Sequence, residues 1–549
     1  MIALPVVFGI IAWLLGKNYI PRLILVVLSS VLNLLFAISL YLSKGFYVTF
    51  PFASHGLDIA FTTDKFPAMF LTFTAAGFLL VSLYSVVFLK GKNYAGRFMF
   101  YLYISIAMIN GALMSDNLGV MLFFWEGLLC TLFAILLINN MQNPKTAVKA
   151  LVLSGTADLM LMLGIIITAY QAGTPYISQM QKLPVSGISG FGFAFMMLGA
   201  VGKAGSMPFH SWIPNAAEDA PAPFLAAFPG MLEKFLGIYL AVRIVTDIYD
   251  LQPGSGMSIA VMILGTLTII VGVAMALIQK DMKRLLAYHA VSQTGYMLLG
   301  VGVALAVLGD PLAMAAFGQT AMEGGLFHII NHAMYKGLLF LAVGAVIYRT
   351  GVWSLNKMGG LGHNMKWTMI FFLIGALAIA GIPPFNGFAS KLMIYESVFA
   401  FNPALSIIAM VVSILTLASF MKVFHSMFMG PQLPEYAEVK EVPKLMIAGM
   451  VILTIFVIGF GLVPDLVVNN LIARRLMPLL IMVHISPRSL EADYDRRSYH
   501  RIRILESAHL GRRHGHGTSL RLADLALRGI RLRQRNRTDE TLPLRKRRA

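Results

Sequence analysis

Apolar stretches of about 20 residues recur from the first residue of the chain to position 465, and each is long enough to cross ~30 Å of hydrocarbon as a helix. Of the 549 residues, 58% are hydrophobic and 12% are charged, against roughly 25% charged in an ordinary soluble domain. The backbone of a segment inside a bilayer must satisfy its own hydrogen bonds, which favours helices. The sequence therefore predicts an all-α polytopic membrane protein.

About 14 transmembrane helices fit this part of the chain. We expect them at 1–16, 22–43, 66–89, 99–115, 118–138, 147–170, 189–209, 222–246, 258–278, 285–308, 323–348, 367–400, 403–428 and 445–465. Pro208 and Pro383-Pro384 predict broken helices at the seventh and twelfth positions, because proline removes a backbone hydrogen bond from a helix. The first stretch has no basic n-region and no small-residue cleavage site, so we expect a span there and not a cleaved signal.

Basic residues between the spans gather on one side of the predicted bundle. That side holds Lys17, Arg22, Lys90, Lys92, Arg97, Lys145, Lys149, Lys280, Lys283, Arg284, Arg349, Lys357, Lys366, Lys440 and Lys444, whereas the other side holds Lys44, Lys65 and Lys182. Because cytoplasmic loops carry an excess of lysine and arginine, the first side is predicted to be cytoplasmic. We expect a multi-pass protein of the cell membrane, in contact with lipid, in a prokaryotic inner membrane.

The segment 486–549 has a different composition from the rest of the chain. It contains 16 arginines and one lysine and carries a net charge of +10, whereas residues 1–485 contain seven arginines and 19 lysines. Such a segment can bind anionic lipid or nucleic acid, but it is also typical of a disordered or vector-derived tail, or of a shifted reading frame. We assign it no function and expect no nucleic-acid partner.

Several ionisable residues lie inside the predicted spans, where a charge costs ~2.5–3.5 kcal/mol at the bilayer centre. The candidate ion-translocating residues are Glu126, Lys203, Lys234, His328, His332, Lys336 and Lys391, with Asp158, His210, Glu233, His289 and Lys422 as possible additions. A salt-bridged or snorkelling side chain is the alternative for any one of them, above all for Glu233 and Lys422. So many costly groups in so few spans favour a row that moves protons or sodium ions.

His328, His332 and Lys336 follow one another at spacings of four residues, which places them on one stripe of a helix with about 6 Å between neighbours. Histidine titrates near neutral pH, and desolvation lowers the proton affinity of lysine, so a proton can step along such a stripe. The two histidines are also spaced as zinc ligands. No third ligand stands at a suitable spacing, Lys336 would repel a cation, and we predict no metal site.

An internal repeat supports an ion path. Lys203 and Lys234 are 31 residues apart, as are Lys391 and Lys422, and the first lysine of each pair lies near a proline break. The matched helices are five spans apart, and this odd offset predicts two units of opposite topology, the arrangement in which transporters place ion sites at broken helices near the membrane midplane. The predicted divisions are three N-terminal helices at 1–98, a first five-helix ion-translocating unit at 99–246, a second, inverted five-helix unit at 258–428, a final helix at 445–465 and the tail at 486–549.

Short motifs in the chain resemble a known family. These are GK at 202–203, WIPNA at 212–216, DAP at 219–221 and QKDMKRLLAY at 279–288. They are similar to the antiporter-like subunits shared by respiratory complex I, Mrp-type sodium/proton antiporters and membrane-bound hydrogenases, over roughly residues 60 to 465. The resemblance implies two inverted five-helix units and no redox active site in this chain.

The family pattern also implies roles for individual residues. Glu126 of the fifth span is expected to pair with Lys203 of the seventh, and Lys234 is the central lysine. The eleventh-span residues fall on His328, His332 and Lys336, and the twelfth-span exit residue falls on Lys391. From the row of buried lysines we hypothesise that redox chemistry in a partner subunit opens or closes the Glu126–Lys203 pair. Lys234 then changes its proton affinity and passes a proton towards His332, Lys336 and Lys391.

Three further segments are more similar to energy-converting hydrogenase subunits than to those of complex I. They are LEKFLGIY at 232–239, YHAVSQ at 288–293 and LASFMK at 417–422. This resemblance implies partner membrane subunits and a redox peripheral arm with nickel–iron and iron–sulfur centres. The single cysteine, Cys130, leaves this chain without a Cys-based cluster, so we expect no cofactor here. A complex I-type dehydrogenase subunit and an Mrp-type antiporter stay open, and a solute transporter and a membrane scaffold are remote alternatives.

Overall fold

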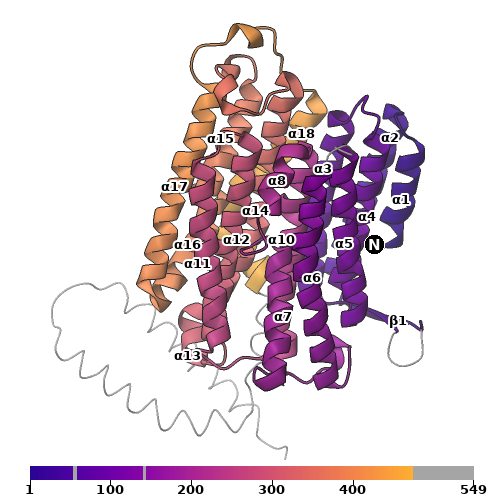
Figure 1. Ribbon diagram of the computed structural model, residues 1–549, viewed down its shortest axis with the longest axis vertical. Helices are drawn as coiled ribbons and strands as arrows, with labels where there is room; N and C mark the ends of the chain where they lie inside the picture. The colour runs from indigo at the N-terminus through magenta and orange to yellow at the C-terminus, as the bar shows by residue number, and fades with distance from the viewer. Residues whose placement is uncertain (53–57, 140–143, 474–549) are drawn as a thin grey trace, which may run out of the picture. The chain divides into compact units, whose positions relative to one another are not determined.

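A computed structural model describes residues 1–52, 58–139 and 144–473 of the chain, and all of these lie in one compact unit, Met1–Val483 (Figure 1). The predicted tail at 486–549 falls outside the described residues. The main elements are α1 (Ala3–Leu14), α2 (Tyr19–Leu42), β1 (Phe46–Phe50), β2 (Ile59–Thr63), α3 (Lys65–Phe88), α4 (Ala95–Met114), α5 (Leu118–Asn139), α6 (Lys145–Ala172), β3 (Leu183–Pro184), α7 (Gly187–Lys203), α8 (Trp212–Asp219), α9 (Ala222–Ala227), α10 (Glu233–Arg243), β4 (Tyr249–Asp250), α11 (Gly256–Leu277), α12 (Met282–Ala306), α13 (Pro311–Ala313), α14 (Gln319–Thr350), α15 (Lys366–Ala380), α16 (Asn386–Phe401), α17 (Pro403–Phe428), α18 (Lys444–Leu462) and α19 (Pro464–Val467).

Helices occupy all fourteen predicted spans. Ten helices of the described residues are long and apolar enough to cross a membrane, and Ala3–Leu14, Gly187–Lys203 and Lys366–Ala380 are shorter apolar helices. The remaining span is α12, whose polar residues lower its hydropathy. The β-strands form two small pairs at helix ends: β1 runs antiparallel to β2, and β3 runs parallel to β4. The all-α polytopic fold predicted from the sequence is confirmed.

Both predicted helix breaks are present, and a glycine with positive φ stands at each. Helix α7 ends at Lys203, Gly205 has a φ of 76°, and the short helix α8 follows the break. Helix α15 ends at Ala380, Gly381 has a φ of 80°, and α16 begins at Asn386. Glycine reaches this left-handed conformation without the steric cost that a Cβ brings, so the two helix breaks are encoded locally.

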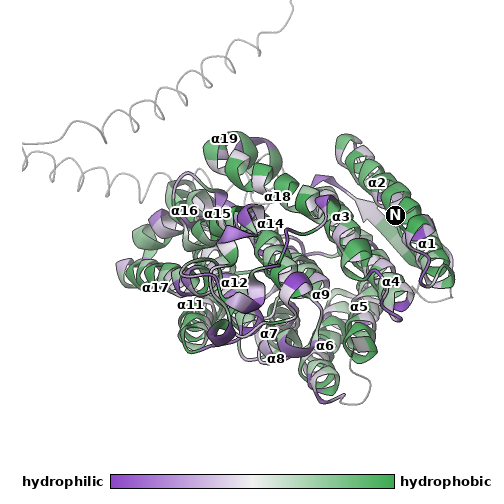
Figure 2. Cartoon of the chain, turned by 90° about the horizontal axis from the view of Figure 1, so that it is seen from above, coloured by the Kyte–Doolittle hydropathy of each residue, from purple (hydrophilic) through white to green (hydrophobic). Residues whose placement is uncertain are grey.

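Two polar-containing helices occupy the centre of the bundle. The segment Ala222–Ile248 joins α9 and α10 through π-helical turns, and the segment Pro311–Thr350 contains α14. The most apolar 18-residue stretch of each segment is completely buried. Figure 2 shows α14 surrounded by α12, α15, α18 and α9. By contrast, 28% of the most apolar 18-residue stretch is buried in the peripheral α2, and 33% is buried in α18. The costly charged residues of the central helices are therefore shielded from lipid.

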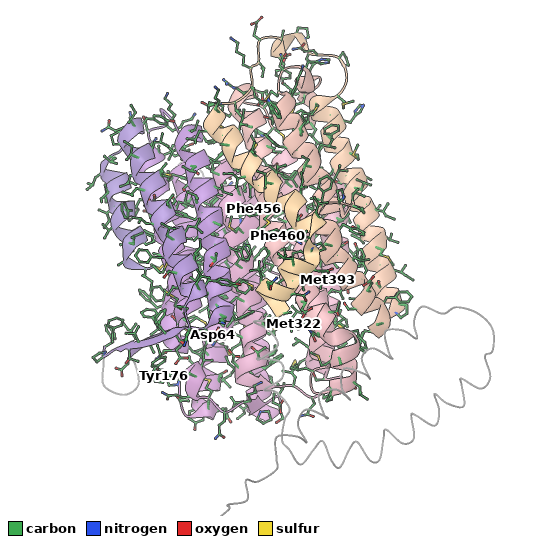
Figure 3. All side chains as sticks on the ribbon, turned by 180° about the vertical axis from the view of Figure 1, so that it is seen from behind. Asp64, Tyr176, Met322, Met393, Phe456 and Phe460 are labelled. Atoms are coloured by element: carbon green, nitrogen blue, oxygen red, sulfur yellow. The ribbon has the colours of Figure 1, made fainter. Side chains whose placement is uncertain are left out.

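Helix α18 closes the bundle on the face seen in Figure 3, where Phe456 and Phe460 are labelled. The Phe460 ring lies 6.4 Å from the Phe73 ring of α3, centroid to centroid. Gly461 packs so tightly on the backbone of Phe385 that a Cβ there would collide with it. The last helix therefore contacts both the N-terminal helices and the break between α15 and α16.

One end of the bundle carries most of the basic loops, and we call it the basic end. A cavity of about 520 Å³ at this end is lined by Lys90, Lys92, Glu218, Lys283 and Trp353, among others. The end of α3 and the starts of α9 and α12 therefore meet at the same surface, as the loop-charge pattern predicts.

Candidate ion-translocation site

Lys203 forms a buried ion pair at the end of α7. Its Nζ lies 2.8 Å from Asp158 Oδ2 of α6, and both side chains are 1% exposed. The indole Nε1 of Trp125 donates to Asp158 Oδ1 at 2.6 Å, and Lys203 Nζ also donates to the Trp125 carbonyl oxygen at 3.4 Å. A buried pair of this kind withstands its desolvation cost only when further hydrogen bonds satisfy both partners, as they do here.

The family pattern assigned Glu126 as the partner of Lys203, but in the structure Lys203 pairs with Asp158 instead. Glu126 lies half-buried on α5, within electrostatic reach of Lys203 and Asp158, but no ion pair joins it to Lys203 among the described residues. The reason is the position of Trp125, which occupies the face of α5 towards Asp158. Its neighbour Glu126 is turned about 100° round the helix by the 3.6-residue period. The role of Glu126 in ion movement stays a prediction.

Lys234 lies behind the break that follows α7. Its Nζ donates to the carbonyl oxygen of Ala204 at 2.9 Å and to Thr294 Oγ1 at 2.7 Å. The carbonyl ends of a helix carry partial negative charge, so the ammonium group caps α7 favourably. Glu233, the residue before it, is 3% exposed, and its carboxylate lies close enough to both the Lys203 and the Lys234 ammonium groups to interact with them electrostatically. Glu233 therefore connects the ion pair to the central lysine.

The predicted stripe on α14 is present and completely buried, but its members do not hydrogen-bond directly to one another among the described contacts. His328 bonds to Ser390 Oγ at 3.0 Å and to Gln293 Oε1 at 3.2 Å. Lys336 Nζ donates to the Leu286 carbonyl oxygen at 2.6 Å. Both ring nitrogens of His332 lack a hydrogen-bond partner within the described part of the chain.

Tyr335 contacts two members of this stripe in different ways. Its hydroxyl lies 3.2 Å from His328 Nε2, and its ring centroid lies 5.6 Å from that of His332. The same hydroxyl donates to Gln293 Oε1 at 3.3 Å, and no hydrogen bond joins it to His332 among the described residues. Tyr335 therefore bonds to His328 and packs its ring against His332, two contacts that the i, i+4 spacing of the three titratable residues did not predict.

Lys391 is held much as Lys234 is held. Its Nζ donates to the Ile379 carbonyl oxygen near the end of α15 at 2.8 Å and to Ser413 Oγ at 2.8 Å. At each helix break a buried lysine thus binds a carbonyl at the end of a helix near a positive-φ glycine and also binds a hydroxyl. The geometry therefore matches Lys391 with Lys234, whereas the 31-residue spacing matched Lys391 with Lys203.

Lys422 differs from the other intramembrane lysines. It is partly exposed, and its Nζ donates to the carbonyl oxygens of Leu277 and Gln279 at the end of α11, at 2.8 and 3.0 Å. This is a capping contact, in keeping with the structural alternative weighed for this residue. Of the two further histidines, His289 is buried with Nε2 2.8 Å from Ser419 Oγ, and His210 is half-buried in the linker between α7 and α8.

Glu323 and Arg243 are among the buried charged residues that were not predicted. Glu323 of α14 is 7% exposed and accepts a 2.6 Å hydrogen bond from Gln319 Nε2. Arg243 of α10 pairs with Asp247 and donates to the Tyr239 hydroxyl at 2.6 Å. Glu323 was the first residue of its predicted span, Arg243 stood near the end of the span at 222–246, and Asp247 stood just beyond it, where charges are common. Their depth depends on helix extensions that hydropathy alone does not reveal.

Comparison with known proteins places this geometry in a family. The model of the NADH:quinone oxidoreductase/Mrp antiporter transmembrane family matches residues 115–416. An uncharacterized protein of Methanocaldococcus jannaschii is 31% identical over 86% of this chain and 96% of its own length. Hydrogenase-4 component B of Escherichia coli is 31% identical and the Na⁺/H⁺ antiporter subunit A1 of Staphylococcus aureus 32% identical, each over 72% of this chain. The matches span 61% and 51% of those two relatives.

Solved structures of multisubunit membrane complexes contain the same fold. A chain of the Mrp complex from Dietzia sp. superposes with a TM-score of 0.76 at 22% identity, covering 87% of this chain and 97% of that one. A chain of the membrane-bound sulfane sulfur reductase, an archaeal respiratory membrane complex, gives 0.74 at 27% identity, covering 86% of this chain and 76% of its own. A chain of respiratory complex I from Thermus thermophilus gives 0.74 at 21%, covering 88% and 99%. The chain therefore belongs to the NADH:quinone oxidoreductase/Mrp antiporter family and is an antiporter-like, multi-pass membrane subunit.

Proposed function

We propose that this chain translocates protons, sodium ions or both as the antiporter-like subunit of a redox complex in the cell membrane, of the energy-converting hydrogenase type. One observation carries the proposal: Lys234, Lys336 and Lys391 are completely buried, yet each ammonium group binds only neutral oxygens among the described residues. Lys203 has a carboxylate partner, so one ion pair stands beside a row of lysines that form no ion pair among the described residues.

The energetic cost of this arrangement argues against a purely structural role. A charged side chain at the bilayer centre costs ~2.5–3.5 kcal/mol even on the mildest scale. A neutral hydrogen-bond donor would hold the carbonyls of Ala204 and Ile379 without that cost. A lysine at these positions adds the ability to bind and release a proton, which a scaffold does not need.

Coupling follows from the contact between the ion pair and the row. When the Lys203–Asp158 pair opens, the Lys203 ammonium is free to approach Glu233, which already lies within its electrostatic reach. Glu233 is also the charge that stabilises the neighbouring Lys234 ammonium. Neutralising Glu233 by Lys203 therefore weakens the hold on the Lys234 proton, because interactions between charges are strong in a low-dielectric interior.

The proposed proton path continues from Lys234 through the residues of the α14 stripe. The charges of Lys234 and Lys336 both act on His332, so a proton that leaves Lys234 changes the electrostatics at the next two groups. The Tyr335 ring packs against His332, and the Tyr335 hydroxyl lies 3.2 Å from His328 Nε2. His328 Nδ1 lies 3.0 Å from the hydroxyl of Ser390, the residue before Lys391. The proposed order is therefore Lys203, Lys234, the α14 stripe and Lys391, with Asp158 replacing Glu126 as the partner that opens.

The hydrogenase assignment rests on the similarity to hydrogenase-4 component B together with the YHAVSQ and LASFMK segments. In the structure these two segments meet, because His289 bonds to Ser419. We propose other membrane subunits and a redox peripheral arm with nickel–iron and iron–sulfur centres as partners. An Mrp-type antiporter is the second candidate, because the S. aureus subunit A1 is about as similar.

The test combines isolation with flux. The protein is purified from its native membrane in mild detergent, and the co-purifying subunits are identified by mass spectrometry. A nickel–iron hydrogenase subunit supports the proposal, and hydrogen oxidation should then drive ion movement in proteoliposomes. A quinone or NADH dehydrogenase subunit moves the chain to the complex I type, and small hydrophobic partners without a redox protein make it an Mrp-type antiporter. Ion-selective ionophores distinguish a proton current from a sodium current.

A further inference from the structure

A groove at the basic end of the bundle lies outside the ion-translocating row. Its volume is about 520 Å³, and it runs along the first turns of α6 to Ser211, the residue that precedes α8. Its lining residues are Pro144, Lys145, Val148, Lys149, Val152, Leu153 and Ser211. Ser211 also ends the linker that follows Lys203, so the groove touches the outer side of the first helix break.

The upper part of this groove is positively charged. Lys145 is exposed, and Lys149 is half-buried, with its Nζ held 3.3 Å from the neutral amide oxygen of Asn215. Residues four apart on a helix stand side by side, about 6 Å from each other, so the two ammonium groups can straddle one anion. Within the described residues neither lysine forms an ion pair with a carboxylate.

The wall below the lysines is apolar and faces outwards. Val148 is 45% exposed and Val152 is 58% exposed. The same face of α6 continues at Leu159, which is 56% exposed. From Val148 to Leu159 the helix rises about 16 Å, which is about half the thickness of the hydrocarbon core. A groove with positive charge at one end and an apolar wall as long as one leaflet is deep matches a phospholipid, which has an anionic headgroup and an acyl chain, better than a soluble anion.

We propose that this groove binds one anionic phospholipid from the leaflet at the basic end, with its phosphate between Lys145 and Lys149 and an acyl chain over Val148 and Val152. Uncompensated ammonium groups at the membrane surface attract anionic headgroups. Since Ser211 forms the opposite wall, a bound headgroup contacts the linker between α7 and α8. The lipid therefore braces the break next to Lys203 from outside.

The test is a lipid titration of the full-length chain in neutral detergent, followed by native mass spectrometry. Phosphatidylglycerol is the probe, and phosphatidylcholine is the comparison with the same acyl chains. A lysine near a membrane surface contributes about fivefold to anionic lipid affinity, so K145Q/K149Q should weaken phosphatidylglycerol binding about 25-fold. The variant should leave phosphatidylcholine binding unchanged.

The chain offers a matched control in K440Q/K444Q. These are two further lysines four residues apart at the basic end, both of them exposed, and Lys444 follows a proline at the start of α18. The control variant should bind phosphatidylglycerol with the same affinity as the unchanged chain. Equal losses in both variants, or equal binding of the two lipids, would overturn the proposal. Displacement of the lipid by glycerol 3-phosphate at equal concentration would show a soluble phosphate site, and a photo-crosslink from position 152 to another subunit would show a protein interface; either result also overturns it.

Discussion

The exchange of Asp158 for asparagine tests the pairing that the structure assigns to Lys203. Asparagine keeps the size of the side chain and an Oδ1 that can accept from Trp125 Nε1, as Asp158 does at 2.6 Å. The substitution removes the charge that faces the Lys203 ammonium at 2.8 Å. It therefore isolates the electrostatic part of the interaction.

The expected cost follows from the burial of the pair. With both side chains 1% exposed, the remaining ammonium group has no water to replace its lost partner. Breaking a buried pair by removing one member costs about 3–5 kcal/mol. Lys203→Met should cost a similar amount, because it leaves the Asp158 carboxylate unpaired. The double variant should recover about 2–3 kcal/mol relative to the sum of the single changes.

The assay is reversible unfolding of the full chain in mixed SDS and maltoside micelles, followed by the loss of helical circular dichroism. Glu126→Gln provides the control, because Glu126 is half-buried and forms no ion pair with Lys203 among the described residues. Its effect should stay within about 0.5–1 kcal/mol and add to that of Lys203→Met. Strong coupling of Lys203 to Glu126, with weak coupling to Asp158, would refute the assignment.

Three further changes should give defined losses in the same unfolding assay. Tyr84→Phe should cost about 1 kcal/mol, because it removes the 2.8 Å hydrogen bond from the Tyr84 hydroxyl to α14. Gly387→Ala should cost about 1–3 kcal/mol, because the added methyl group would overlap the backbone at the end of α15. Ser413→Ala should cost about 1.5–3 kcal/mol, because Lys391 loses one of two hydrogen-bond acceptors. Ser397→Ala is the control and should stay near 0.5 kcal/mol, since that hydroxyl bonds to its own helix.

The fold was largely predictable because its signals are local. An apolar stretch of about 20 residues predicts a span wherever it occurs. The breaks at Pro208 and at Pro383-Pro384 are encoded by short segments that combine proline with a nearby glycine. The π-helical turns around α10 left no such signal. The short helix α8 was not predicted for a different reason: a hydropathy average over the ~20 residues of a membrane span is too long to resolve a helix of eight residues.

The candidate site was predictable in residue type but not in partnership. Buried lysines and histidines stand out in an apolar span, so Lys234, Lys336 and Lys391 were found directly. The partner of Lys203 depends on which face of α5 and α6 turns inwards, and a helix without a marked apolar face does not encode this in its own sequence. For the same reason the depth of Glu323 and the exposure of Lys422 became clear only from the packing.

The most direct test of the central claim is coupled ion flux in proteoliposomes that contain the complete native complex with Lys234→Ala. Lys234 is 1% exposed and belongs to the buried row, so ion transport should be lost while assembly and subunit composition stay unchanged. Lys422→Ala is the matched control: this lysine caps α11 and is partly exposed, and its loss should leave transport in place. Normal ion flux per electron transferred in the Lys234→Ala complex would contradict the proposal that the buried lysines carry the ions.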